Sequence, residues 1–395
     1  MISDPLLLTA VVAATTLLAF WLDWRIPAMG KGGASLLALA RGAIAWLLLA
    51  VHIGDLKRAG PRMVAAFALA GLGTAMGAFV GAFIFADFLG ENTWKLAGTL
   101  TGTYTGGSLN FVAVGTGLEL PPGLFAGATA ADAMTTGLWL GASLLLPIWL
   151  ARFYPPIPAA ATETDVLDPG AGGTGVAPGP ESSGPPREAA GEDEVSKDAH
   201  HPFFMKEAIS TLDLAVLMAV GLALLAVSDL TAAGLAALAE SGRVPGWVGS
   251  IPSVLWLTTF ALLIGHTRWL HRPPGALQLG TLALHFFFVV IGIWSRVSEI
   301  LAVGVEVFFY TLVVVGVHGL VVYGGGRLAR LDLGSLSVAS QAAVGGPSSA
   351  LAVAVSRKWP GFILPGIIVG LVGYAAGNYL GFGVAYLVRG LGIGL

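Results

Sequence analysis

Two polar, glycine-rich segments interrupt otherwise apolar stretches of membrane-spanning length, at Thr101–Asn110 and Ser337–Ser349. Each contains a Gly-Gly pair, which allows the backbone to leave the helical conformation. Non-helical backbone at membrane depth is tolerated only where it is buried in protein or lines a cavity. A pair of such interruptions, one in each half of a chain, is the best sequence indicator of a transporter's substrate site.

The side chains of these segments could bind a small polar or anionic solute. Where a helix breaks, the amides at one new N-terminus attract anions and the carbonyls at the other half's C-terminus attract cations. The alternative is that serine and threonine only bond their own helix and glycine only packs. The candidate solute-binding residues are Thr103, Tyr104, Thr105, Gly106, Gly107, Ser108 and Asn110 in the first segment, and Gln341, Gly345, Gly346, Pro347, Ser348 and Ser349 in the second.

Two acidic residues inside apolar stretches are candidates for ion coupling. Asp132 has no basic neighbour in the sequence. A carboxylate at membrane depth costs several kcal/mol unless it is paired, hydrated or protonated. Asp132 is therefore a candidate for binding a sodium ion or a proton; the alternative is a neutral carboxyl bonded to a neighbouring helix. Glu306 is the second candidate, and for it a structural polar contact is an equal alternative.

Motifs of soluble enzymes are missing from the chain. The sequence has no phosphate-binding loop, no His-Glu-x-x-His zinc motif and no Gly-x-Ser-x-Gly elbow. Its seven histidines do not form a ligand cluster, and it has no cysteine. We therefore expect no enzymatic activity, no cofactor beyond a sodium ion or proton, and no nucleic-acid partner.

The elements that must position these residues are membrane-spanning helices. The chain has 395 residues, of which 55% are hydrophobic and 11% charged, and a mean hydropathy of +0.81. This composition indicates an all-α polytopic membrane protein in contact with the lipid bilayer. About eleven spans are predicted, near 6–22, 34–53, 63–88, 95–117, 122–150, 208–228, 251–265, 276–293, 299–324, 333–356 and 361–391.

A polar segment divides these spans into two groups. Residues 155–203 are rich in Pro, Gly, Ala and Glu, and contain nine acidic and two basic residues. Such a composition cannot bury enough apolar surface to fold. The sequence therefore predicts a first membrane repeat at 1–154, a disordered acidic linker at 155–205 and a second membrane repeat at 206–395.

The two groups of spans match each other. A shift of 239 positions places Gly106-Gly107 on Gly345-Gly346 without a gap, and carries the spans from 34–53 to 122–150 onto those from 276–293 to 361–391. Chance similarity of glycine-rich membrane helices is the alternative. We interpret the match as an internal duplication, with one broken helix in each half.

The basic residues predict that the duplication is inverted. They precede the span 63–88 but follow its counterpart 299–324, and basic loops mark the cytoplasmic side. They are Lys57, Arg58 and Arg62 in the first half, and Arg327 and Arg330 in the second. Two observations oppose this interpretation. The matched spans are an even number of crossings apart, which we ascribe to a missed or split span, and Arg357 and Lys358 fall on the external side.

The chain resembles the YjcL-like bacterial membrane proteins, a family catalogued as a domain of unknown function. The resemblance rests on Tyr104–Phe111, Ala130–Asp132 and Gly345–Ala350, and covers most of the chain outside the linker. It implies a relationship to sodium/proton antiporters and sodium–bile-acid symporters. That relationship implies crossed broken helices in a core domain beside a panel or dimerisation domain, and elevator-like transport, with Asp132 in the place of the antiporters' functional aspartate.

The sequence therefore predicts a multi-pass transporter of the bacterial inner membrane. It would move a small polar or anionic organic solute with sodium ions or protons, at a site where the two broken helices cross. A monovalent cation/proton antiporter and a non-transporting membrane scaffold are the alternatives. A homodimer is an open alternative to a monomer.

Overall fold

The fold is known from a computed structural model that describes residues 33–162, 209–267, 270, 273–294 and 297–394. The described part of the chain is all-helical. The predicted span 6–22 and most of the predicted linker lie outside these residues.

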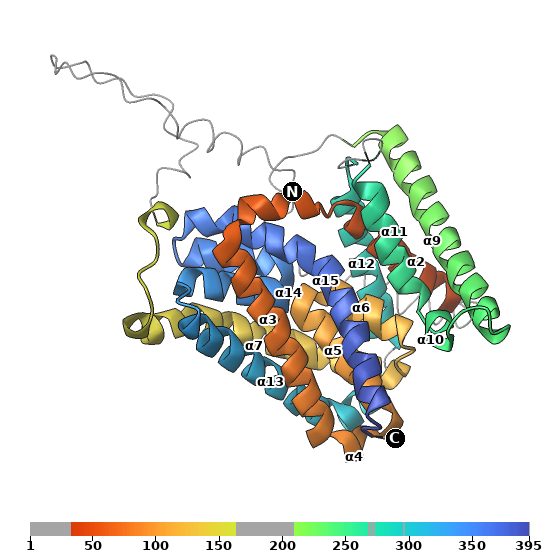
Figure 1. The fold of residues 1–395 in the computed structure, drawn as a ribbon, viewed down its shortest axis with the longest axis horizontal. Coiled ribbons are helices and arrows are strands. Elements are labelled where there is room, and N and C mark those ends of the chain that lie inside the picture. Colours follow the sequence, from red (N-terminus) through yellow and green to blue (C-terminus); the bar gives the residue numbers. More distant parts are fainter. Residues whose placement is uncertain (1–32, 163–208, 268–269, 271–272, 295–296, 395) are drawn as a thin grey trace.

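Every other predicted span coincides with a helix or a pair of helices (Figure 1). The helices are α2 (Gly33–Leu49), α3 (Leu56–Ile84), α4 (Ala86–Leu89), α5 (Thr93–Gly106), α6 (Ser108–Gly117), α7 (Pro122–Leu150), α9 (Thr211–Glu240), α10 (Gly246–Gly249), α11 (Ser253–Gly265), α12 (Ala276–Trp294), α13 (Val297–Leu328), α14 (Leu333–Ser356) and α15 (Ile363–Gly390). Six helices or helical stretches of the described chain are long and apolar enough to cross a membrane. The protein is therefore polytopic, and the count of about eleven spans stays a prediction.

The first interrupted segment is a hairpin, not a broken helix that crosses the membrane. A Cβ atom placed on Gly102 would lie 2.9 Å from the Val114 side chain, and one on Gly98 would lie 3.0 Å from Leu118. Helices α5 and α6 are therefore antiparallel neighbours. The chain turns at Gly107, with φ 81° and ψ −174°, a conformation essentially restricted to glycine.

The second interrupted segment folds back in the same way. Within α14, Gly346 has φ 78° and ψ −171°. Val338 and Ala350, on either side of this break, would both meet a Cβ placed on Gly366 of α15. The expectation of two broken helices that cross each other is therefore wrong, because each glycine reverses the chain instead of interrupting a straight helix. We call α5–α6 the first hairpin and α14 the second hairpin.

The hairpins are too short to cross a bilayer. Helices α5 and α6 have 14 and 10 residues, which corresponds to about 21 and 15 Å. The hydrocarbon core of a bilayer is about 30 Å thick. Helix α14 is one of the six candidate spans by length, but the break at Gly346 divides it into two halves that are also too short, 333–345 and 347–356. Each hairpin therefore enters the membrane and returns to the side from which it came.

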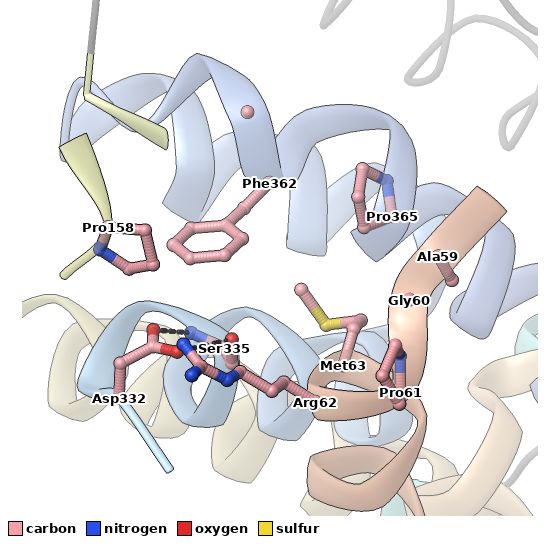
Figure 2. Close-up of a pocket in the computed structure, with 11 residues that line it drawn as sticks. Ala59, Gly60, Pro61, Arg62, Met63, Pro158, Asp332, Ser335, Phe362 and Pro365 are labelled. Atoms are coloured by element: carbon pink, nitrogen blue, oxygen red, sulfur yellow. Dashed lines mark hydrogen bonds between the residues drawn. The ribbon is translucent and has the colours of Figure 1, made fainter. Parts of the chain in front are cut away.

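The hairpins open on opposite sides of the molecule. At the open end of the first, Lys95 Nζ donates to the Glu119 carbonyl at 3.0 Å. The open end of the second lies beside the start of α3, where a pocket of about 310 Å³ is lined by Arg62, Asp332 and Phe362 (Figure 2). Helix α3 runs from this pocket to α4, which leads into the first hairpin (Figure 1).

Helices α3 and α13 run antiparallel, as the basic residues predict. A Cβ atom on Gly73 would meet His318, one on Gly77 would meet Val314, and one on Gly81 would meet Tyr310. The even number of predicted crossings between these two helices included the first hairpin. With that hairpin removed and the other predicted spans counted as before, the number is odd, which agrees with the antiparallel directions of α3 and α13.

The same correction removes the second objection to an inverted arrangement. Arg357 and Lys358 follow the second hairpin, so they lie on the side from which that hairpin enters. This side also carries the start of α3 and the end of α13, with their basic residues. The positive-inside rule predicts that this is the cytoplasmic side.

The helices form two groups. The core group contains α3, α7, α13, α15 and the two hairpins, and the side group contains α2, α9, α11 and α12 (Figure 1). Within the side group, Arg41 Nη1 donates to Asp229 Oδ2 at 3.0 Å and Trp46 Nε1 to the Leu217 carbonyl at 2.8 Å. These bonds attach α9 to α2.

Small residues allow the core helices to approach closely. A Cβ on Gly377 of α15 would lie 2.8 Å from the Gly102 carbonyl of α5, and one on Gly381 would lie 2.8 Å from that of Gly98. Such contacts drive helix association in lipid. The first hairpin is thus held against α15 through backbone.

The first residues of the predicted linker pack onto the helices. A 3₁₀ turn covers Ala159–Ala161, Ala161 is buried in the core, and Pro158 lines the pocket of Figure 2. Residues 155–162 are therefore part of the folded membrane region.

The hairpin geometry predicts the labelling of single cysteines. The chain has no cysteine, so single cysteines can be compared directly. Leu328 lies before α14 and Ser356 is its last residue, and both positions are exposed. The variants are Leu328→Cys and Ser356→Cys. We expect a membrane-impermeant maleimide to reach both from the same side of sealed vesicles, and to reach Glu91→Cys only from the other side. Labelling of Leu328→Cys and Ser356→Cys from opposite sides would show that α14 crosses the membrane.

Candidate functional site

The turns of the two hairpins, at Gly107 and Gly346, are in contact, and we call them the tips. A Cβ atom on Gly107 would lie 3.4 Å from both Cα and N of Gly346. The two break glycines, which the sequence places 239 positions apart, therefore face each other where the hairpins meet. The structure thus brings together the two predicted halves of the solute site.

Each tip carries a buried amide with one unpaired atom. Asn110 Nδ2 donates to the Tyr374 carbonyl at 2.7 Å and to Asn378 Oδ1 at 2.8 Å, while its Oδ1 has no partner among the described residues. Gln341 Oε1 accepts from Ser143 Oγ at 3.2 Å, while its Nε2 has no partner in the same part of the chain. Unpaired buried polar atoms are uncommon and need an explanation. Here one acceptor and one donor lie beside the tips.

The outer surfaces of the tips are accessible. Ser108, the first residue of α6, and Ser348, two residues after the second break, are both exposed. Gly345 and Ser349 are half-buried, and Ser349 Oγ donates to the Gly346 carbonyl at 3.1 Å. A small molecule can therefore reach the start of the returning half of each hairpin.

Two predicted solute-binding residues have packing roles. A side chain on Gly106 would collide with the Gly373 carbonyl of α15. The ring of Pro347 lies against Gly370, where a Cβ would be 2.8 Å from the Pro347 nitrogen. Both residues fix the tips against α15.

Asp132 is buried on α7 and faces hydroxyl groups. Its neighbours are Thr103 and Tyr104 of the first hairpin, and Thr136, whose Oγ1 donates to Asp132 Oδ1 at 3.4 Å. The Thr103 and Tyr104 hydroxyls are buried, and no described residue offers them a partner that meets hydrogen-bond geometry. Thr105, the other unpaired threonine of α5, lies beside Gly71 of α3 instead.

One carboxylate with several hydroxyl oxygens suits a monovalent cation or a proton, since hard cations prefer oxygen ligands. A divalent metal normally needs more acidic or imidazole ligands. The described residues contain no group of three or more His, Cys, Asp or Glu side chains that could hold one. Asp132, Thr103 and Tyr104 are thus the residues that could hold an ion.

The structure does not bring Glu306 to the tips. Glu306 is half-buried on α13, twelve residues before His318, which contacts Thr74 beneath the first hairpin. Twelve residues correspond to about 18 Å of helix.

Helix α7 has a polar face that was not predicted from the sequence. Asp132, Thr136, Trp139 and Ser143 recur at three- to four-residue spacing, so they share one side of the helix. Trp139 Nε1 donates to Ser340 Oγ at 2.9 Å, in the second hairpin, and Ser143 bonds Gln341. Helical spacing was the signal that could have revealed this face.

Comparisons with known proteins cover both halves of the chain. A family model described as "Protein of unknown function (DUF819)" matches residues 33–168 and 182–391. The "Uncharacterized membrane protein YjcL" of Bacillus subtilis (strain 168) is 25% identical over 344 residues, which is 86% of this chain and 79% of the relative. No solved structure matches.

The family match spans both hairpins, Asp132 and the helices around them. The relative is described as a membrane protein. The chain is therefore a multi-pass bacterial membrane protein and belongs to the DUF819 family of proteins of unknown function.

Proposed function

We propose that the chain is a secondary active transporter whose solute binds beside the contact of the two hairpin tips. The contact of Gly107 with Gly346 carries this proposal. Because the hairpins enter from opposite sides, a solute at this contact is separated from each side of the membrane by one hairpin. Alternating access requires a site placed in this way.

The similarity of the two hairpins supports the proposal. The break glycines Gly107 and Gly346 share nearly the same dihedral angles. The end of α6 and the end of α14 are also alike, since Glu119 and Lys358 both have positive φ, of 54° and 56°. The hydrogen bonds at these two ends form a common helix cap that the ends of α9, α13 and α15 share, so the matched breaks carry the comparison.

The tips favour a solute with an anionic group. The returning halves of both hairpins begin at the tips, where their free amides can bind an anion. The entering halves end at the same tips, so the helix dipoles there are balanced and the preference for an anion rests on the donor groups. The unpaired Gln341 Nε2 beside Gly345 adds a donor. A carboxylate or a similar anion would pair with these groups, and Asn110 Oδ1 would accept from a hydroxyl or amino group of the same solute.

Asp132 supplies the coupling site in this proposal. Its carboxylate can bind a sodium ion or a proton together with the Thr103 and Tyr104 oxygens. These two residues belong to the first hairpin, so ion binding and solute binding share α5. The core group would then move against the side group in an elevator-like step, during which the bond from Asn378 Nδ2 to Thr258 Oγ1 of α11, 2.9 Å long, would break.

The proposal is tested with the purified chain. A thermal-shift screen of organic acids, amino acids and dipeptides should find compounds that raise the melting temperature, and a radiolabelled hit should accumulate in proteoliposomes under a sodium or proton gradient. A cation/proton antiporter would instead change the internal pH of pyranine-loaded vesicles after a sodium pulse without any organic solute. A scaffold would show neither response.

Valine at either break glycine should disable the site. The backbone conformation of Gly107 and Gly346 costs other residues about 1–3 kcal/mol, and a side chain on Gly107 would also separate the tips. We expect both variants to insert into the membrane, melt at a lower temperature and lose the ligand-induced shift. Gly137→Val on α7, where a Cβ meets open space, is the control. A wild-type response of Gly346→Val would reject the paired site.

Asp132→Asn should uncouple transport. Asparagine preserves the shape of the side chain but cannot alternate between ionised and ion-bound or protonated forms. We expect gradient-driven accumulation of the labelled hit to disappear while its thermal shift remains, because the solute contacts the tips. Asp87→Asn, at an exposed position, should behave as wild type. Unchanged accumulation by Asp132→Asn would exclude this residue as the coupling site.

A further inference from the structure

A buried histidine lies between the two hairpins. His318 is on α13 and is fully buried. Its Nδ1 lies 2.9 Å from Thr74 Oγ1 of α3, and its Nε2 lies 2.8 Å from Ser340 Oγ of the second hairpin. The indole of Trp139 packs edge-on against the imidazole, with ring centroids 5.6 Å apart and planes at 87°.

The hydrogen-bond partners determine the tautomer of this histidine. Thr74 Oγ1 donates its single proton to the Tyr104 carbonyl, at 2.7 Å, because a carbonyl can only accept. The bond between Thr74 and His318 must therefore use a proton on Nδ1. The carbonyl of Ala70, also on α3, faces the imidazole as a further acceptor.

The other ring nitrogen then accepts. Trp139 Nε1, which can only donate, bonds Ser340 Oγ at 2.9 Å. Ser340 Oγ can therefore donate its own proton to His318 Nε2. All five groups are satisfied by a neutral imidazole with its proton on Nδ1, and all its partners are uncharged.

This chain of bonds joins the hairpins near their tips. Tyr104 lies three residues before Gly107 in the first hairpin, and Ser340 lies six residues before Gly346 in the second. Thr74 on α3, His318 on α13 and Trp139 on α7 complete the connection, so three surrounding helices contribute.

We propose that His318 is a positioning residue that holds the two hairpin tips in register. The imidazole is suited to this because it presents a donor and an acceptor on opposite edges of one rigid ring, whereas a side-chain amide carries both on one carbon. The inference builds on the proposed solute site at the tips. Its tests measure hairpin geometry and not transport, so the two can fail separately.

The tautomer can be measured directly. In protein with ¹⁵N-labelled histidine, the signals of His318 are those lost in His318→Phe. We expect a protonated Nδ1 and an unprotonated Nε2 at neutral pH. A protonated Nε2, in either the other tautomer or the imidazolium, would contradict the bond pattern and the inference.

The position of one tip relative to the other can be measured by cross-linking. The chain has no cysteine, so Ser108→Cys and Ser348→Cys, at exposed positions next to the breaks, report on tip separation with a short bifunctional maleimide. Rapid cross-linking is expected in the otherwise unchanged chain. If this pair fails to cross-link, the tip contact fails and the proposed function fails with it.

Loss of the network should slow this reaction. In His318→Phe and in the smaller change Ser340→Ala, we expect the cross-linking rate to fall by about tenfold, as buried groups lose their partners. Ser340→Thr, which retains the hydroxyl, should restore the rate. His285→Phe is the matched control, because His285 is exposed and, within the part of the chain that the structure describes, bonds its own helix at the Thr281 carbonyl.

The melting temperature of each variant separates positioning from general stability. The rates are compared well below the lowest melting temperature. A lower melting temperature with an unchanged cross-linking rate in both His318→Phe and Ser340→Ala would show a purely structural role and overturn the inference. An equal loss of rate in His285→Phe would do the same.

Discussion

The backbone conformation of Gly107 and Gly346 is the constraint around which the rest of the core is arranged. At these residues the chain leaves the helix, and in hydrocarbon each exposed amide or carbonyl would cost several kcal/mol. The structure meets this cost by placing one break against the other and surrounding both with helices. Because the tips bury each other, neither hairpin can be moved alone without exposing the backbone of its partner. A site beside the contact of the tips is therefore sensitive to the position of both hairpins.

Close approach to α15 is the second requirement, and glycine meets it. Gly98 and Gly102 of the first hairpin face Gly381 and Gly377 of α15, where a Cβ atom would lie 2.8 Å from a carbonyl oxygen. In lipid, where burial of apolar surface gives no driving force between helices, such backbone contact supplies much of the packing energy. The side group lacks this density of glycine contacts with the core, and the polar bond from Asn378 to Thr258 is among the links between them.

Much of the core could be predicted from the sequence because apolar length and glycine pairs are local signals. The spans at 63–88 and 122–150 and the breaks at Gly107 and Gly346 are of this kind. The fold-back could not be predicted, because a Gly-Gly pair inside a 24-residue apolar stretch has the same composition whether the helix continues or reverses. Two observations in the sequence reflected the fold-back: the even number of predicted crossings between matched spans, and Arg357 on the apparently external side. Asp132 was found from its charge, but Thr103 and Tyr104 as its partners depend on packing between α5 and α7.

Helix α7 connects the two parts of the candidate site. Its polar face begins at Asp132, which contacts the first hairpin through Tyr104, and ends at Ser143, which bonds Gln341 of the second. Because a helix is rigid over these three turns, a shift of α7 that follows a change in the charge of Asp132 would move the Gln341 amide beside the tip. Physical coupling requires such an element, with contacts to both sites that differ between two states. The contacts to both hairpins are present on α7, so it is the element through which ion binding at Asp132 would reach the solute site.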